Sequence, residues 1–135
     1  MSIRLSVRDG STELAWLETE TTDDFYYMRD GIHAALETGA YGSRFPLFMQ
    51  RYEPSEWKAE EVESLAKEIE EIISELRFMP PLPFDDYWRG KYKASGRDCA
   101  KLFDVYVDAA GQPFFARLLE LCRVARAAGK PIAME

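Results

Sequence analysis

The chain has 135 residues, a length typical of one folded domain, and its 47% hydrophobic residues are enough to fill a core. The formal net charge of −7 argues against binding to nucleic acids or anionic membranes. It favours a basic partner, although acidity that only keeps the protein soluble is the alternative. No stretch approaches the roughly 18 apolar residues of a membrane helix, and the N-terminus lacks the apolar core of a secretory signal. Cys99 and Cys122, which form no CxxC pair, are typical of reduced thiols, so we expect a cytoplasmic protein.

The first third of the chain predicts a β-hairpin followed by a helix. Apolar residues alternate over 3–7, which predicts a strand. An Asp-Gly turn follows, and then a second short strand over 14–17. Thr22-Asp23-Asp24 predicts a helix start, because a threonine cap and two acids complement the free N–H groups. Gly39 is predicted to end this helix, and Gly31 inside it predicts a close crossing by another element. The apolar stripe of the helix consists of Phe25, Met28, Ile32, Ala35 and Leu36.

The stretch after this helix, Gly42-Ser43-Arg44, combines a glycine, a hydroxyl and a guanidinium. This trio is compatible with a phosphate cradle, or with a helix-exit turn in which Arg44 forks onto a carboxylate or carbonyl group. A P-loop requires GxxxxGK[ST] between a strand and a helix, whereas here a helix precedes and an apolar run follows. The structural turn is the better interpretation. We predict a strand over 47–52, entered through Pro46.

The strongest element is a long amphipathic helix over 58–76. Its apolar residues follow 3-4-3-4 spacing, and glutamates occupy much of the remaining surface. The prolines that follow cannot continue a helix. Residues 84–96 show no clean period and are predicted to be irregular.

The C-terminal third predicts a strand over 102–107, a turn, a helix and a closing strand over 130–134. Pro113 suits the first helical position and Gly129 the helix end. The order ββαβαβαβ indicates an α+β fold, a small sheet packed by about three helices, in a single domain over 1–135.

The chain carries no recognisable catalytic or metal-binding set. His33 is the one histidine, and no GxSxG elbow supplies a nucleophile for a triad, so we predict a structural or surface role for it. Neither cysteine has a ligand-spaced companion, and the acidic helix lacks calcium-loop spacing. We therefore predict no metal, no cofactor and no catalytic residue. Asp85 and Asp86 are adjacent carboxylates that would need burial to act as an acid–base pair.

Two clusters of aromatic and charged residues suit a protein partner, because aromatics dominate interface energies. One lies in 84–92 and the other in 52–57. The same aromatics are compatible with covering the edges of the core or with sealing a homodimer. The predicted partner-binding residues are Asp85, Asp86, Tyr87, Trp88, Tyr92, Tyr52, Glu56 and Trp57.

The run GSRFPLFMQRYEPSEWKAEEVESLAKEIEEI resembles the central block of a bacterial immunity protein family, immunity protein 70. Its members combine a Gly-Ser-Arg-Phe-Pro turn, an apolar strand, a Glu-Trp pair and a helix. The ending DAAGQPFFARLLELCRVARAAGKPIAME is similar to the last third of the family. The resemblance covers roughly 40–80 and 103–134, and departs from the pattern at the N-terminus and in 84–100. The matching positions are Gly42 to Pro46, Glu56, Trp57, Glu61, Leu65, Glu68 and Ile69.

The resemblance implies a cytoplasmic antidote that binds a secreted toxin domain and blocks its active site or substrate entry. Gly42, Ser43, Arg44 and Pro46 would then form a structural corner of the family. Because variable segments of immunity proteins should carry specificity, the interface is expected in 84–92, flanked by Tyr52 and Trp57. A basic nuclease or an NAD-hydrolysing toxin is compatible with an acidic inhibitor.

Two other functions fit the sequence. One is a small hydrolase or carbohydrate-active enzyme that uses Asp85 or Asp86. The other is an adaptor in a secretion or regulatory assembly.

Overall fold

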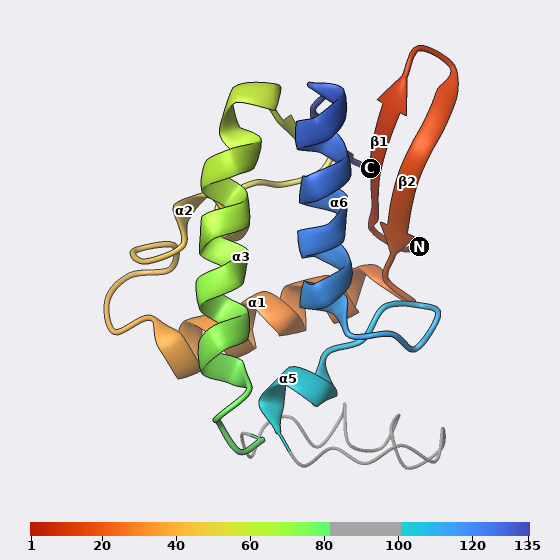
Figure 1. Cartoon of the computed structure of the whole chain (residues 1–135). Coiled ribbons are helices and arrows are strands. Elements are labelled where there is room, and N and C mark those ends of the chain that lie inside the picture. The colour runs from red at the N-terminus through yellow and green to blue at the C-terminus, as the bar shows by residue number, and fades with distance from the viewer. Residues whose placement is uncertain (82–100) are drawn as a thin grey trace.

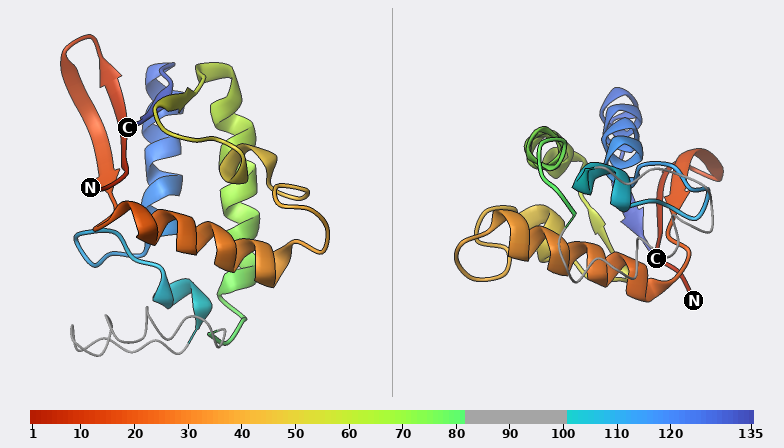
Figure 2. Two further views of the ribbon diagram at one scale, coloured as in Figure 1. Left: turned by 180° about the vertical axis from the view of Figure 1, so that it is seen from behind. Right: turned by 90° about the horizontal axis from the view of Figure 1, so that it is seen from below.

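The computed structural model describes residues 1–81 and 101–135, and within them the protein has the predicted α+β fold (Figure 1). The described strands form one antiparallel sheet with the order β2-β1-β4-β3. Two long helices, α3 (Val62–Leu76) and α6 (Phe114–Ala128), lie side by side and run in opposite directions. Helix α6 lies between α3 and the hairpin, and α1 (Thr22–Leu36) runs across both long helices (Figure 2).

The N-terminal hairpin is confirmed. Strand β1 spans Arg4–Asp9 and strand β2 spans Thr12–Glu18, joined by a turn in which Gly10 has a φ of 63°. Leu5, Val7 and Leu17 are buried beneath α6, so the period-2 pattern identified the face that points to the core. Strand β2 lies at one edge of the sheet.

Helix α1 begins where the cap signal predicted, within one residue. The Thr21 side chain accepts a hydrogen bond from the Asp24 backbone N–H, and the helix ends at Leu36, three residues before the predicted stop at Gly39. The close crossing expected at Gly31 is present. A Cβ at this position would lie 1.8 Å from the hydroxyl of the buried Tyr106.

The strand predicted over 47–52 is wrong, because a short helix, α2 (Pro46–Met49), begins there. Pro46 occupies the first turn, where its fixed φ suits a helix and no N–H is required. The Glu68 carboxylate on α3 accepts hydrogen bonds from the Leu47 and Phe48 N–H groups, at 3.2 and 3.0 Å. A side chain distant in sequence therefore caps this helix.

A short strand that the sequence did not predict, β3 (Ser55–Trp57), follows and pairs with β4. The long helix is confirmed, although its first turn is a 3₁₀ helix (Ala59–Glu61) that leads into α3. The apolar stripe of α3 is buried as its spacing predicted, and it includes Val62, Leu65, Ile69, Ile72 and Leu76.

The strand predicted over 102–107 is also wrong. Residues Leu102–Val105 form a short helix, α5, and Val107 makes only a single bridge to Pro113. Leu102, Val105 and Tyr106 are buried at helical spacing, a pattern that a short apolar run shares with a strand. Helix α6, its left-handed cap at Gly129 and the closing strand β4 (Ile132–Met134) are confirmed.

Candidate partner-binding surface

The segment from 37 to 58, which we call the connecting segment, joins α1 to α3 and is held by carboxylates. Glu37, only 6% exposed, accepts hydrogen bonds from the backbone N–H groups of Gly42, Arg44 and Phe45, each at 3.0 Å. Gly42 has a φ of 83°, a conformation that favours glycine. These N–H groups already have an anionic acceptor inside the chain, so they are not available to hold a phosphate.

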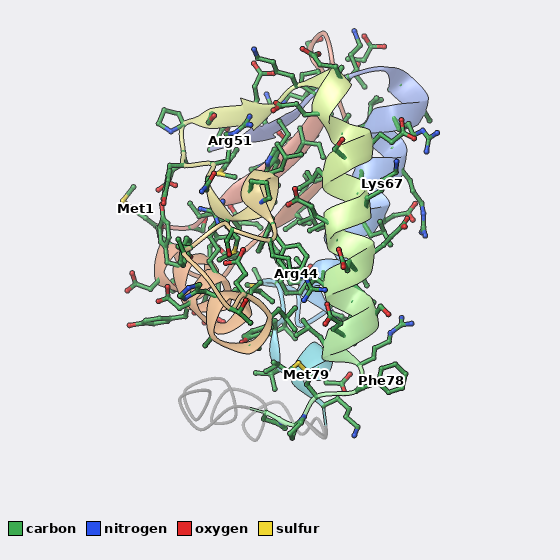
Figure 3. The ribbon with its side chains drawn as sticks, turned by 90° about the vertical axis from the view of Figure 1, so that its left-hand side faces the viewer. Met1, Arg44, Arg51, Lys67, Phe78 and Met79 are labelled. Carbon is green, nitrogen blue, oxygen red and sulfur yellow. The ribbon has the colours of Figure 1, made fainter. Side chains whose placement is uncertain are left out.

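Arg44 ties the same corner to two helices. Figure 3 shows the Arg44 side chain beside helix α3. Its guanidinium donates to the carbonyl oxygen of Leu36 at 3.1 Å, to Glu71 at 2.8 Å and to Glu75. The hydrogen bonds to Glu75 and then to Glu71 raise the pKa of Arg44 above its usual range. The contacts are those of a helix-exit turn, in which an arginine forks onto carboxylate and carbonyl groups.

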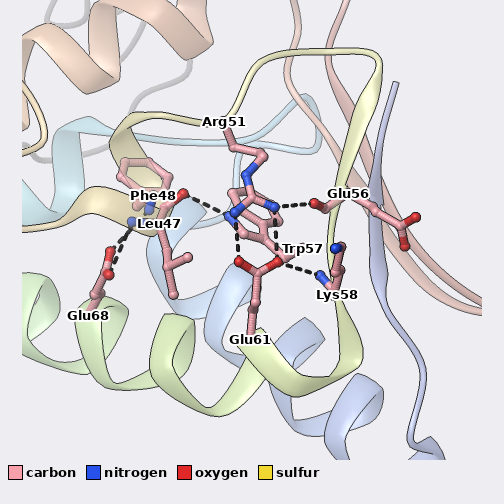
Figure 4. Close-up of polar contacts among 8 residues, drawn as sticks. All are labelled: Leu47, Phe48, Arg51, Glu56, Trp57, Lys58, Glu61 and Glu68. Atoms are coloured by element: carbon pink, nitrogen blue, oxygen red, sulfur yellow. Dashed lines mark hydrogen bonds and ion pairs between the residues drawn. The ribbon is translucent and has the colours of Figure 1, made fainter.

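A second clamp lies where the connecting segment enters α3 (Figure 4). The Arg51 guanidinium forks onto both carboxylate oxygens of Glu61, at 3.0 and 2.8 Å, and donates to the Glu56 carbonyl. Glu61 also accepts from the Lys58 N–H at 2.9 Å. The hydrogen bonds from Arg51 and then from the Lys58 backbone lower the pKa of Glu61 to about 2. Glu61 is thus ionised at neutral pH and keeps this entry turn closed.

The predicted partner-binding residues in 52–57 separate into buried and exposed ones. The Trp57 side chain is fully buried, and its indole N–H donates to the Leu47 carbonyl at 2.7 Å, so it belongs to the core and not to a partner surface. Glu56 is exposed, and Tyr52 is 56% exposed. Asp85, Asp86, Tyr87, Trp88 and Tyr92 lie outside the described residues.

Tyr52 belongs to an ordered cluster that the sequence did not reveal. Its ring stacks on Tyr26 of α1, with ring centroids 6.4 Å apart and an interplanar angle of 22°. The Tyr26 hydroxyl donates to Glu53 at 2.6 Å. Burial, followed by the hydrogen bond and the charge of Glu53, raises the pKa of Tyr26 to about 12. We call Tyr26, Tyr52, Glu53 and Glu56 the tyrosine surface.

Next to the tyrosine surface, a second aromatic pair joins α1 to the connecting segment. The Tyr41 ring lies 5.2 Å from that of His33, and the His33 imidazole Nε2 lies 3.1 Å from the Gly39 carbonyl oxygen. His33 therefore bridges the end of α1 and the loop after it, a structural position. Exposed aromatics held by stacking lose little side-chain entropy when a partner covers them.

The described residues offer no metal centre. Among them, no group of three or more histidine, cysteine, aspartate or glutamate residues is arranged to hold a metal ion. Cys122 is buried in α6, and burial raises its pKa to about 12, which keeps the thiol protonated. No helix in the described ranges is long and apolar enough to cross a membrane.

Exposed aromatic and acidic side chains, ordered by ring stacking and a hydrogen bond, are the described feature that suits a protein partner. The family model for Immunity protein 70 matches residues 11–134, and because this match spans most of the chain, the protein belongs to that family. No curated protein and no solved structure was found to match the chain. Membership supports an immunity function and implies a toxin as the partner.

Proposed function

We propose that this protein binds the toxin domain of a cognate secreted protein in the cytoplasm and neutralises it by occluding its active site. The protein would have no catalytic activity of its own. Membership of the Immunity protein 70 family carries this proposal, because immunity proteins act on a toxin partner. We treat the whole chain as one binding domain.

We place the contact on the tyrosine surface and on residues 84–92, which contain most of the predicted partner-binding residues. Tyr52 is 56% exposed and stacks on the Tyr26 ring, so it offers a partner an aromatic contact. Glu53, which accepts a hydrogen bond from Tyr26, adds negative charge beside these rings, and Glu56 is exposed four residues after Tyr52 in the chain. The proposed interface also includes Asp85, Asp86, Tyr87, Trp88 and Tyr92.

The charge of the chain favours a basic toxin. With a net charge of −7, the protein would attract a cationic partner and raise the association rate at low salt. A nuclease, which must bind a polyanion, fits this requirement, and an NAD-hydrolysing enzyme is the second candidate. An association rate that does not change between low and high salt would argue against electrostatic steering.

The first experiment is growth rescue. A toxin domain captured from the native cells with this protein as bait, and identified by mass spectrometry, is expressed in the cytoplasm of a test strain, with and without this protein. Restored growth, together with a purified one-to-one complex, supports the proposal. Continued growth arrest in the presence of soluble, folded protein contradicts it.

The second experiment locates the contact. Trp88→Ala should cost about 2 kcal/mol of binding, or about 30-fold in Kd, with little change in folding stability. Trp16→Ala is the matched control, because Trp16 is an aromatic residue 46% exposed on strand β2. If Trp88→Ala binds the toxin as tightly as Trp16→Ala does, the assignment of the contact to residues 84–92 is wrong.

A further inference from the structure

Among the described residues, one arginine side chain lies buried without a hydrogen-bond partner, against the Tyr52 ring of the tyrosine surface. Arg29 is 0% exposed, and its side-chain nitrogens Nε, Nη1 and Nη2 have no hydrogen-bond partner in the described part of the chain. A guanidinium presents five N–H donors, and a buried charged group without partners is costly. The lack of partners is therefore unusual for a folded protein and calls for an explanation.

Aromatic rings contact the guanidinium group of Arg29, but they accept no hydrogen bond from the N–H groups along its edge. The guanidinium carbon of Arg29 lies 4.4 Å from the ring centroid of Phe25, 5.5 Å from that of Phe48 and 5.4 Å from that of Tyr52. Cation–π contacts of this kind stabilise the charge without satisfying any N–H group. The nearby carboxylate of Glu53 accepts its hydrogen bond from Tyr26.

The three rings differ in their freedom to move. Phe25 and Phe48 are fully buried, whereas Tyr52 is 56% exposed. A rotation of the Tyr52 side chain alone would therefore uncover the guanidinium edge at the surface. Burial lowers the pKa of Arg29 to about 10, so the group is still a cation at neutral pH.

We propose that Arg29 is an anion-binding site, opened by rotation of Tyr52, that receives one carboxylate side chain of the bound toxin. This inference rests on the proposed function and names one contact of that interface. The planar fork of an arginine matches a carboxylate with two parallel hydrogen bonds. A single negative charge suits the site better than a doubly charged phosphate, because the acidic Glu53 lies close to the same tyrosines.

The site can be tested without the toxin, by titrating the whole protein with sodium acetate and recording the NMR signal of the Arg29 side-chain Nε–H group. Sodium chloride at equal ionic strength is the control. We expect a saturable shift with acetate in the wild type and about tenfold tighter binding in Tyr52→Ala, whose site needs no rotation to open. Arg29→Lys serves to assign the signal. The absence of a saturable shift in both proteins, or an equal shift with chloride, overturns the anion site.

The contact with the toxin is tested by comparing Kd values for the wild type and Arg29→Met. We expect at least about 30-fold weaker binding, because an acidic side chain of the toxin would be left without its partner. Arg29→Lys, which keeps the charge but not the fork, should recover part of the loss. Equal affinity for Arg29→Met overturns this inference and leaves the proposed function intact. Failure of the wild-type protein to bind the toxin at all overturns both.

Discussion

Glu37→Gln should destabilise the protein strongly, although it changes only one atom of a side chain outside the apolar core. The Glu37 carboxylate is 6% exposed and accepts three backbone hydrogen bonds, from Gly42 on one oxygen and from Arg44 and Phe45 on the other. A glutamine can at best keep the two bonds on its amide oxygen, and its NH₂ group would then face the third N–H. One buried backbone N–H group would be left without an acceptor, and the two remaining hydrogen bonds would be to a neutral oxygen instead of a charged one.

The resulting loss is about 2–4 kcal/mol in the free energy of unfolding, or on the order of 10 °C in Tm. Removing the negative charge near Glu68 offsets a small part of this, because Glu37 adds to the raised pKa that burial gives Glu68. Urea unfolding followed by circular dichroism measures the change, and faster amide exchange at Gly42, Arg44 and Phe45 would localise it. The control is Glu70→Gln on the exposed side of α3, which should cost less than about 0.5 kcal/mol. A Glu37→Gln variant as stable as this control would refute the role assigned to the carboxylate.

Three further substitutions test other parts of the structure. Gly31→Ala should lower stability by about 1–3 kcal/mol in thermal unfolding despite a better helix propensity, because the new Cβ would meet the Tyr106 hydroxyl at 1.8 Å; a more stable variant contradicts the crossing. Glu61→Gln should cost about 1 kcal/mol at neutral pH. The folded pKa of Glu61, about 2, lies below its unfolded value, so its contribution is lost as pH falls towards 2, and the difference from wild type in urea unfolding should shrink by about pH 3. A difference that does not change with pH would exclude the pairing of Glu61 with Arg51. Tyr26→Phe should remove one late-ionising phenol from the ultraviolet absorbance titration. Because the folded pKa of Tyr26, about 12, is raised above 10.0, its contribution to stability is complete below pH 10.0 and is lost as pH rises towards 12.

The sequence predicted the elements whose signals are local. The long helix, the last helix and the hairpin all repeat an apolar pattern over many residues or carry their own stop signals, such as Gly129. The family was also recognisable from the sequence, because its turn, its Glu-Trp pair and its helix lie close together in the chain.

The two wrong strands are short apolar runs whose backbone state was decided elsewhere. Over 46–49, two N–H groups of the chain are bonded by Glu68, about twenty residues further on. Over 102–105, the first N–H donates to the Met79 carbonyl, which belongs to a distant part of the sequence. Runs this short fit a strand and a helical turn equally well, so distant contacts choose between them.

At the candidate surface, too, the sequence gives the residue types, and contacts made in the fold decide which of them are exposed. Tyr52 and Trp57 are both aromatic and lie five positions apart, yet one is exposed and the other is fully buried. Arg29 is a residue type that is usually solvated, but it lies on the buried face of α1 with Phe25 and Ile32. The fold places Phe48 and Tyr52 over it. Residue type and spacing therefore determined the long helices, the hairpin and the family of this protein. Only the tertiary structure decided which aromatics face a partner and which charge lies unpaired beneath them, because those properties depend on residues that meet only after folding.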